Sequence, residues 1–214
     1  LAAAAVVVAA LSSASFRMVG PIYGQEVGLS AGQIAWFLSA FVLGGALAQF
    51  PIGWLADKFD RRWVLIWLSA ASIVSCAVTV MAAGMGTGAV FLSATLFGLT
   101  TFPIYSVAAS HAHDFAKSEE RVELSAALMF WFAVGAIFAP YLASVLIENY
   151  GPAALFGMIS IGHGVLVIFG LTRMRARPTA KKRTPYVYAP RTTFMIGRLM
   201  RRQRDNRSDG RKAP

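Results

Sequence analysis

Residues Gly53 to Trp63 read GWLADKFDRRW and place five charged side chains within six consecutive positions. No Asp, Glu, Lys or Arg occurs from Val27 to Ala56, before this group, or from Trp63 to His113, after it. A membrane span needs about 20 apolar residues to cross roughly 30 Å of hydrocarbon, and both uncharged stretches exceed that length. The pattern therefore predicts membrane spans on either side of a short charged turn.

The composition of the whole chain agrees with a membrane protein. Its 214 residues are 57% hydrophobic and 14% charged, with a mean hydropathy of +0.58, whereas soluble domains contain about 25% charged residues. Uniformly apolar runs favour helices over a closed barrel, and only these two structures satisfy the backbone in lipid. We predict an all-α integral membrane protein with six spans. They are Leu1–Gly24, Ala31–Ala56, Trp63–Ala83, Ala89–Ser110, Leu124–Ile147 and Ala153–Thr172.

The basic residues of the links predict the orientation of these spans. Three links, at residues 23–30, 84–88 and 148–151, contain no Lys or Arg. The basic residues of the opposite links are Lys58, Arg61, Arg62, Lys117 and Arg121. Because cytoplasmic loops are enriched in Lys and Arg, we expect these links and the C-terminus to be cytoplasmic.

The C-terminal segment differs in composition from the rest. Residues 1–172 contain 6 Lys/Arg and 8 Asp/Glu, whereas residues 173–214 contain 14 and 2. We expect residues 1–174 to form the six-helix domain and residues 175–214 to form a basic, largely disordered tail. Apolar and Arg residues at helical spacing near 192–204 predict a short amphipathic helix that binds anionic lipids. We expect no nucleic-acid partner, because no known binding module accompanies this charge.

The charged turn resembles the loop signature of the major facilitator superfamily, G-x-L-A-D-[RK]-x-G-R-[RK]. The matching residues are Gly53, Asp57, Lys58, Arg61 and Arg62. Asp60 replaces the usual Gly, and we expect it to tolerate the left-handed backbone that Gly would adopt there. Residues 21–59, 101–115 and 135–156 also look like the YcaD-like branch of bacterial transporters, so the resemblance covers nearly all of residues 1–174.

This resemblance implies a fold and a function. The chain is expected to be the C-terminal half of a twelve-helix transporter, built from two inverted three-helix repeats in the inner membrane. The first residue already lies in an apolar run, so we expect the N-terminal six helices to be missing from this sequence. The implied activity is transport of a small solute by alternating access. Neither an enzymatic activity nor a cofactor or metal is expected.

The resemblance also implies a gating role for the charged turn. The matching Asp of the family contacts a helix of the other half and closes the cytoplasmic side, so this role passes to Asp57. Arg61 is its expected local partner. The simpler alternative is a solvated turn that serves only as a positive anchor at the cytoplasmic face.

Arg17 is the main candidate for the substrate path. It is the only Lys or Arg within a predicted span, and a charge at that depth costs about 3 kcal/mol or more. We expect it to face the aqueous path and to bind an anionic or polar group, the alternative being that it snorkels to the outer interface. Gln49, Tyr105 and Trp131 are further candidates for this path, with ordinary packing as their alternative.

Two other functional classes remain open at this point. An intramembrane serine protease would need a Ser opposite His163 of the sixth span, but no Gly-x-Ser-x-Gly motif occurs. We expect His163 instead to be buried and hydrogen-bonded between helices. A membrane scaffold with a lipid-binding basic tail is the second class. The charged turn around Asp57 favours transport over both the protease and the scaffold.

Overall fold

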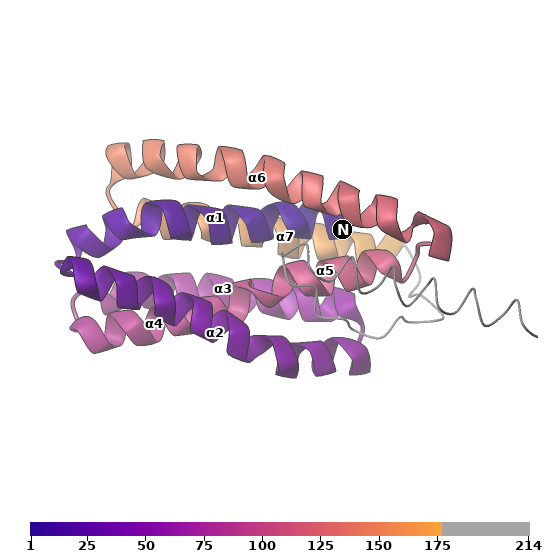
Figure 1. The fold of residues 1–214 in the computed structure, drawn as a ribbon, viewed down its shortest axis with the longest axis horizontal. Helices are drawn as coiled ribbons and strands as arrows, with labels where there is room; N and C mark the ends of the chain where they lie inside the picture. Colours follow the sequence, from indigo (N-terminus) through magenta and orange to yellow (C-terminus); the bar gives the residue numbers. More distant parts are fainter. Residues whose placement is uncertain (177–214) are drawn as a thin grey trace, which may run out of the picture.

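The computed structural model describes residues 1–176 and is entirely helical within them (Figure 1). Six helical stretches in this part of the chain are long and apolar enough to cross a membrane, which confirms the prediction of an all-α, multi-pass membrane protein. The predicted tail from residue 177 onward, including the amphipathic helix near 192–204, lies outside the described residues. The helices are α1 (Ala2–Glu26), α2 (Ala31–Lys58), α3 (Arg61–Ala82), α4 (Thr87–Thr101), α5 (Pro103–His113), α6 (Arg121–Tyr150) and α7 (Ala154–Ala176), with a 3-10 turn at Ser118–Glu120.

The turns between the helices follow from local sequence. Ser30 and Gln33 form a capping box at the start of α2, in which each side chain accepts a hydrogen bond from the other residue's backbone N–H. Gly28, Gly86 and Gly151 adopt φ angles of 83°, 92° and 81°, which a residue with a Cβ rarely adopts.

The turn between α2 and α3 differs from the sequence expectation. Asp60 has φ −63° and ψ 119°, so its backbone is extended rather than left-handed. Its side chain accepts a hydrogen bond from the backbone N–H of Arg62 and caps the N-terminus of α3. The expectation of a left-handed Asp60 was therefore wrong, because a carboxylate suits the N-cap position and the capped turn needs no positive φ.

The helical hydrogen-bond pattern of the fourth span is interrupted for one residue at Phe102, before Pro103, which separates α4 from α5, although Phe102 keeps helical angles of φ −62° and ψ −44°. Proline has no N–H to donate, and its ring clashes with the carbonyl four residues earlier, so a helix cannot continue undisturbed through it. Pro21, Pro51 and Pro140 lie inside α1, α2 and α6 without ending them. The fourth span is thus a membrane-length helix, Thr87–His113, with one interruption in its hydrogen bonding before Pro103.

The helices pack as three intimate pairs, α1 with α6, α2 with α4, and α3 with α7. Exchanging the first three spans with the last three leaves this set of pairs unchanged, as expected for two related three-helix units. Figure 1 shows α6 running along α1 and α2 crossing α4 on the other side of the bundle. The arrangement confirms the prediction of half a twelve-helix fold.

Glycine residues let two of these pairs approach closely. A Cβ on Gly44 would meet the backbone carbonyl of Thr95, and a Cβ on Gly98 would meet the carbonyl of Phe41, so α2 and α4 touch backbone to backbone. In the related pair, a Cβ on Gly135 of α6 would lie 2.9 Å from the Cβ of Ala10 in α1. Small residues at such crossings allow the dispersion contacts that hold helices together in lipid.

The interior has two clusters, one toward each end of the bundle. Toward the uncharged end, Phe16 packs against Phe37, Phe41 and Phe97 with ring centroids 4.4 to 5.2 Å apart. Toward the charged end, aliphatic side chains of α1, α3, α5, α6 and α7 pack together instead. The rigid aromatic cluster and the glycine crossings fix the uncharged half of the bundle.

We predict that Gly98→Ala lowers the melting temperature of the detergent-solubilised chain, because the new methyl group overlaps the Phe41 carbonyl at a cost of about 1–3 kcal/mol. Gly157→Ala in α7 is the matched control, since a Cβ there meets nothing within 4 Å. That control should leave the melting temperature unchanged or raise it, because Ala favours a helix over Gly. Equal melting temperatures for the two variants would contradict the close α2–α4 crossing.

Candidate functional site

The charged turn lies at one end of the bundle, next to the end of the fourth span. Asp57 is one residue before the end of α2, Arg61 begins α3, and Asp114 follows the last residue of α5. Figure 1 shows the ends of α2 and α5 and the beginning of α3 at the same end of the molecule. Residues almost sixty positions apart along the chain are thereby brought together.

Arg61 is the centre of this site. Its side chain is only 1% exposed, and its guanidinium lies 2.6 Å from Oδ1 of Asp114 and 2.9 Å from Oδ1 of Asp57. The same group donates to the backbone carbonyls of Ser110, at 2.9 Å, and Ala56, at 3.3 Å. Arg61 therefore joins α3 to the C-terminal ends of both α2 and α5.

The electrostatics of this arrangement follow from the helix ends. The last carbonyls of a helix lack intrahelical partners and form the negative end of its dipole, so a cation is stabilised there and a carboxylate is not. Asp57 and Asp114 both occupy such ends, and Arg61 compensates both. The two acids differ in access, since the Asp114 side chain is 4% exposed and that of Asp57 is 43% exposed.

Asp114 was missed as a functional residue by the sequence reasoning. Asp114 is separated from the charged turn by 51 residues without Asp, Glu, Lys or Arg, from Trp63 to His113. A useful signal was nevertheless present, because an acid directly after a helix C-terminus needs a cation nearby. The same argument that assigned Arg61 to Asp57 applies equally to Asp114.

The remaining residues of the signature lie around this centre. Arg62 pairs with Asp60 at 2.8 Å. The Lys58 ammonium lies over the Trp54 ring, 4.8 Å from its centroid. Gly53 is buried on α2. Of the five signature residues, two are thus exposed at the end of α2, Asp57 and Lys58, and three are buried, Gly53, Arg61 and Arg62.

Arg17 lies on α1, exposed, at the level of the break between α4 and α5. Its guanidinium carbon is 5.5 Å from the centroid of the Phe102 ring, a cation–π distance. Phe102 is held in place by an edge-on contact with Phe41 at 5.2 Å. It also fills the space that a Cβ on Gly45 would occupy. Phe102, which the sequence reasoning did not select, therefore positions Arg17.

The other path candidates are spread over three helices. Gln49 is half-buried one turn beyond Gly45 on α2. Tyr105 is half-buried on α5, and its ring meets that of Phe132 edge-on at 5.5 Å. Trp131 on α6 is 45% exposed. Gln49 lies about one helical turn after Gly45, which contacts Phe102. Tyr105 lies about one turn after Phe102 itself. Trp131 has no such position relative to Phe102.

His163 confirms its sequence expectation. It is fully buried in α7, and its Nε2 lies 2.9 Å from Oγ of Ser12 in α1. Ser12 is also fully buried and donates to the carbonyl of Val8. A nucleophilic serine must be reachable by its substrate, so this Ser–His pair is a packing contact between helices.

Comparisons with known proteins agree with this fold. The sequence profile of the Major Facilitator Superfamily matches residues 2–204. Among solved structures, the POT family transporter PepTSo shares a TM-score of 0.65 at 19% identity, over 87% of this chain and 39% of that one. An auto-inhibited POT family peptide transporter gives 0.63 at 18% identity. At such low identities the likeness concerns the fold alone.

Curated relatives share both sequence and family. The uncharacterized MFS-type transporter YE1530 of Yersinia enterocolitica is 28% identical over 167 residues, or 78% of this chain and 41% of the relative. The MFS-type transporter YcaD of Salmonella arizonae is 30% identical over 140 residues, or 65% of this chain and 35% of the relative. The chain thus spans about two fifths of the relatives it matches. With its signature turn, six spans and matching profile, the chain belongs to the Major Facilitator Superfamily.

Proposed function

We propose that the chain acts as one half of a secondary transporter that carries a small anionic solute by alternating access. The observation that carries this proposal is the Arg61 centre, in which the signature turn is folded into a buried ion-pair cluster at one end of the bundle. A simple positive anchor would leave these side chains in solvent. The simpler alternative therefore does not account for a guanidinium that is 99% shielded.

Asp57 serves as the gating residue in this proposal. Arg61 pairs with the Asp57 carboxylate, while 43% of the Asp57 side chain stays exposed at the end of α2. A carboxylate in that position suits the positive end of a helix from a second half. When the halves rock apart, this outer contact breaks, whereas the buried Arg61–Asp114 pair keeps the turn folded.

Several features of the whole protein belong to this proposal. The partner is an N-terminal six-helix half that packs against this one. The charged end faces the cytoplasm of the inner membrane, because Lys58, Lys117 and the basic tail lie on that side of the predicted topology. The tail from residue 175 binds anionic lipids of the same leaflet. We propose no catalytic role, because the relatives that the chain matches are named as transporters of this family.

Arg17 supplies the substrate specificity. Its guanidinium is exposed, and it makes no ion pair among residues 1–176. The Phe102 ring fixes one face of the guanidinium and leaves its N–H groups available for a carboxylate or phosphate. An anionic solute would thereby neutralise a cation that is otherwise costly at this depth.

We predict that Asp57→Asn lowers the initial rate of solute uptake at least tenfold in proteoliposomes that contain both halves. Its pair with Arg61 is partly exposed and contributes only about 0.2–1 kcal/mol to stability, so the melting temperature should change little. Asp60→Asn is the control, because Asn caps a helix as well as Asp. Loss of uptake in both variants, or in neither, would argue against a specific gating role for Asp57.

We further predict that Arg17→Gln abolishes uptake of an anionic solute, whereas Arg17→Lys retains part of it because the charge remains. The measurement is uptake of a panel of radiolabelled carboxylates, phosphates and sulfonates by the same proteoliposomes. Phe102→Leu should weaken apparent affinity while leaving the charge in place. Unchanged uptake of every transported anion by the Arg17→Gln variant would remove Arg17 from the substrate path.

A further inference from the structure

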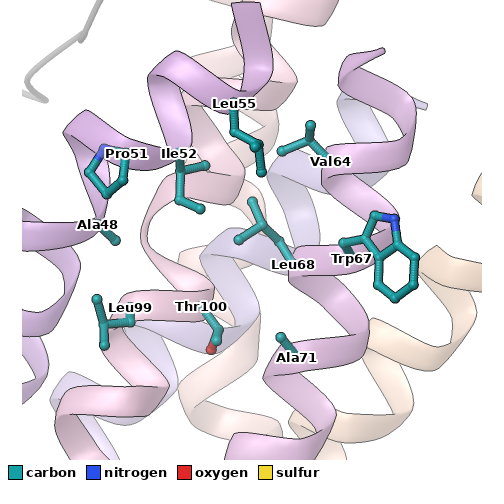
Figure 2. Close-up of a pocket in the computed structure, with 10 residues that line it drawn as sticks. All are labelled: Ala48, Pro51, Ile52, Leu55, Val64, Trp67, Leu68, Ala71, Leu99 and Thr100. Atoms are coloured by element: carbon teal, nitrogen blue, oxygen red, sulfur yellow. The ribbon is translucent and has the colours of Figure 1, made fainter. Parts of the chain in front are cut away.

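A groove of about 380 Å³ lies between α2, α3 and α4. Figure 2 shows Leu55 of α2 facing Val64 and Leu68 of α3 across it. The indole of Trp67 lies at one edge. All its lining side chains but one are apolar. They are Ala48, Pro51, Ile52, Leu55, Val64, Trp67, Leu68, Ala71, Leu99 and Thr100.

The groove opens on the side of the bundle where side chains of α3 are exposed. Trp67 is 68% exposed, and Ala71 beside it is exposed as well. Together with Trp63, Val74 and Val78 they form an apolar stripe at helical spacing along α3. A continuous apolar stripe on a membrane-spanning helix faces lipid tails, so the groove is open to the bilayer.

A cation lies just beyond the lined part of the groove, at the charged end of α2. Pro51, Leu55 and Lys58 recur at i, i+4 and i+7, so Lys58 lies on the groove side of α2 just beyond Leu55. Its ammonium is 4.8 Å from the Trp54 ring centroid, and it makes no ion pair among residues 1–176. Trp63 occupies the same level on α3. Tryptophans at this position are typical of the membrane–water interface.

The groove matches one leaflet in length. Ala48 and Lys58 are ten residues apart on α2, which is about 15 Å of helix. This equals half of a hydrocarbon core of about 30 Å. A phospholipid whose phosphate rests at Lys58 can therefore lay one acyl chain along the groove as far as Ala48.

We propose that the groove between α2, α3 and α4 binds an anionic phospholipid, with one acyl chain against Leu55, Leu68 and Trp67 and the phosphate at Lys58. The apolar lining selects the chain, and the single ammonium selects the charge of the headgroup. The side chains that line the groove do not include those of the Arg61 cluster. Lipid binding at this site does not require transport activity, so the proposal can be tested independently of the proposed function.

The experiment uses the whole 214-residue chain in liposomes, with Trp67 as the reporter. The other tryptophans, at 36, 54, 63 and 131, are replaced by Phe, which keeps a ring under Lys58. Quenching of Trp67 fluorescence is compared between brominated phosphatidylglycerol mixed with unbrominated phosphatidylcholine and brominated phosphatidylcholine mixed with unbrominated phosphatidylglycerol. In 1:1 mixtures of the two lipids, the site should hold brominated phosphatidylglycerol about fivefold more often than brominated phosphatidylcholine, the ratio that one lysine supplies at an anionic surface.

Two variants and a matched control separate this site from its alternatives. Lys58→Gln should abolish the headgroup preference, whereas Lys117→Gln, which removes a cation from the same end of the bundle away from the groove, should keep it. Ala71→Leu should weaken the preference by filling the groove while Lys58 remains. Equal quenching by both lipids, or a preference that survives Lys58→Gln, would overturn the proposal. Lack of quenching by either lipid would also overturn it, because protein rather than lipid would then cover Trp67.

Discussion

The burial of one guanidinium organises the charged end of this bundle. An arginine with 1% of its side chain exposed must be fully paired, because an isolated buried charge costs several kcal/mol. Arg61 meets that requirement with two carboxylates and two backbone carbonyls taken from the ends of α2 and α5. The helices can meet only where all four acceptors converge, so the pairing fixes the α2–α3 turn against the fourth span.

The two ends of the bundle are held by different forces. At the uncharged end, aromatic rings and glycine crossings bring α1, α2 and α4 into close dispersion contact. At the charged end, aliphatic packing is supplemented by the Arg61 pairs. The break at Phe102 and Pro103 lies between them, and Arg17 reaches the Phe102 ring at that level. The only Lys or Arg deep within a predicted span thus lies beside the interruption of the fourth span.

Long uncharged windows made the six spans predictable, because lipid tolerates few charges and demands helices of about 20 residues. The charged turn between α2 and α3 was equally predictable, since its charged residues lie close together in sequence. The break of the fourth span was harder, because Pro21, Pro51 and Pro140 remain within continuous helices while Pro103 does not. Which proline interrupts a helix depends on tertiary packing, which no local pattern encodes.

The same distinction applies within the candidate site. Asp57 and Arg61 are four residues apart, so their pairing follows from helical spacing. Asp114 joins them only because α5 ends beside the start of α3. Phe102 is likewise brought to Arg17 by the fold, through its contact with Gly45 and Phe41. Contacts within one turn of the chain were therefore predictable, and contacts between helices required the structure.

The central claim is that Arg61 and Asp114 stabilise the fold as a pair, and a double-mutant cycle tests it most directly. Denaturant unfolding of the solubilised chain is measured for Arg61→Gln, for Asp114→Asn and for the double variant. Arg61→Gln leaves the buried Asp114 carboxylate without its cation, so the account predicts a loss of about 3–5 kcal/mol for that variant. Asp114→Asn leaves Arg61 paired with Asp57, so a smaller loss of about 1.5–3 kcal/mol is predicted. The double variant should lose little more than Arg61→Gln alone, which gives a coupling energy of about 1.5 kcal/mol or larger. Losses that add to within about 0.5 kcal/mol would contradict the account.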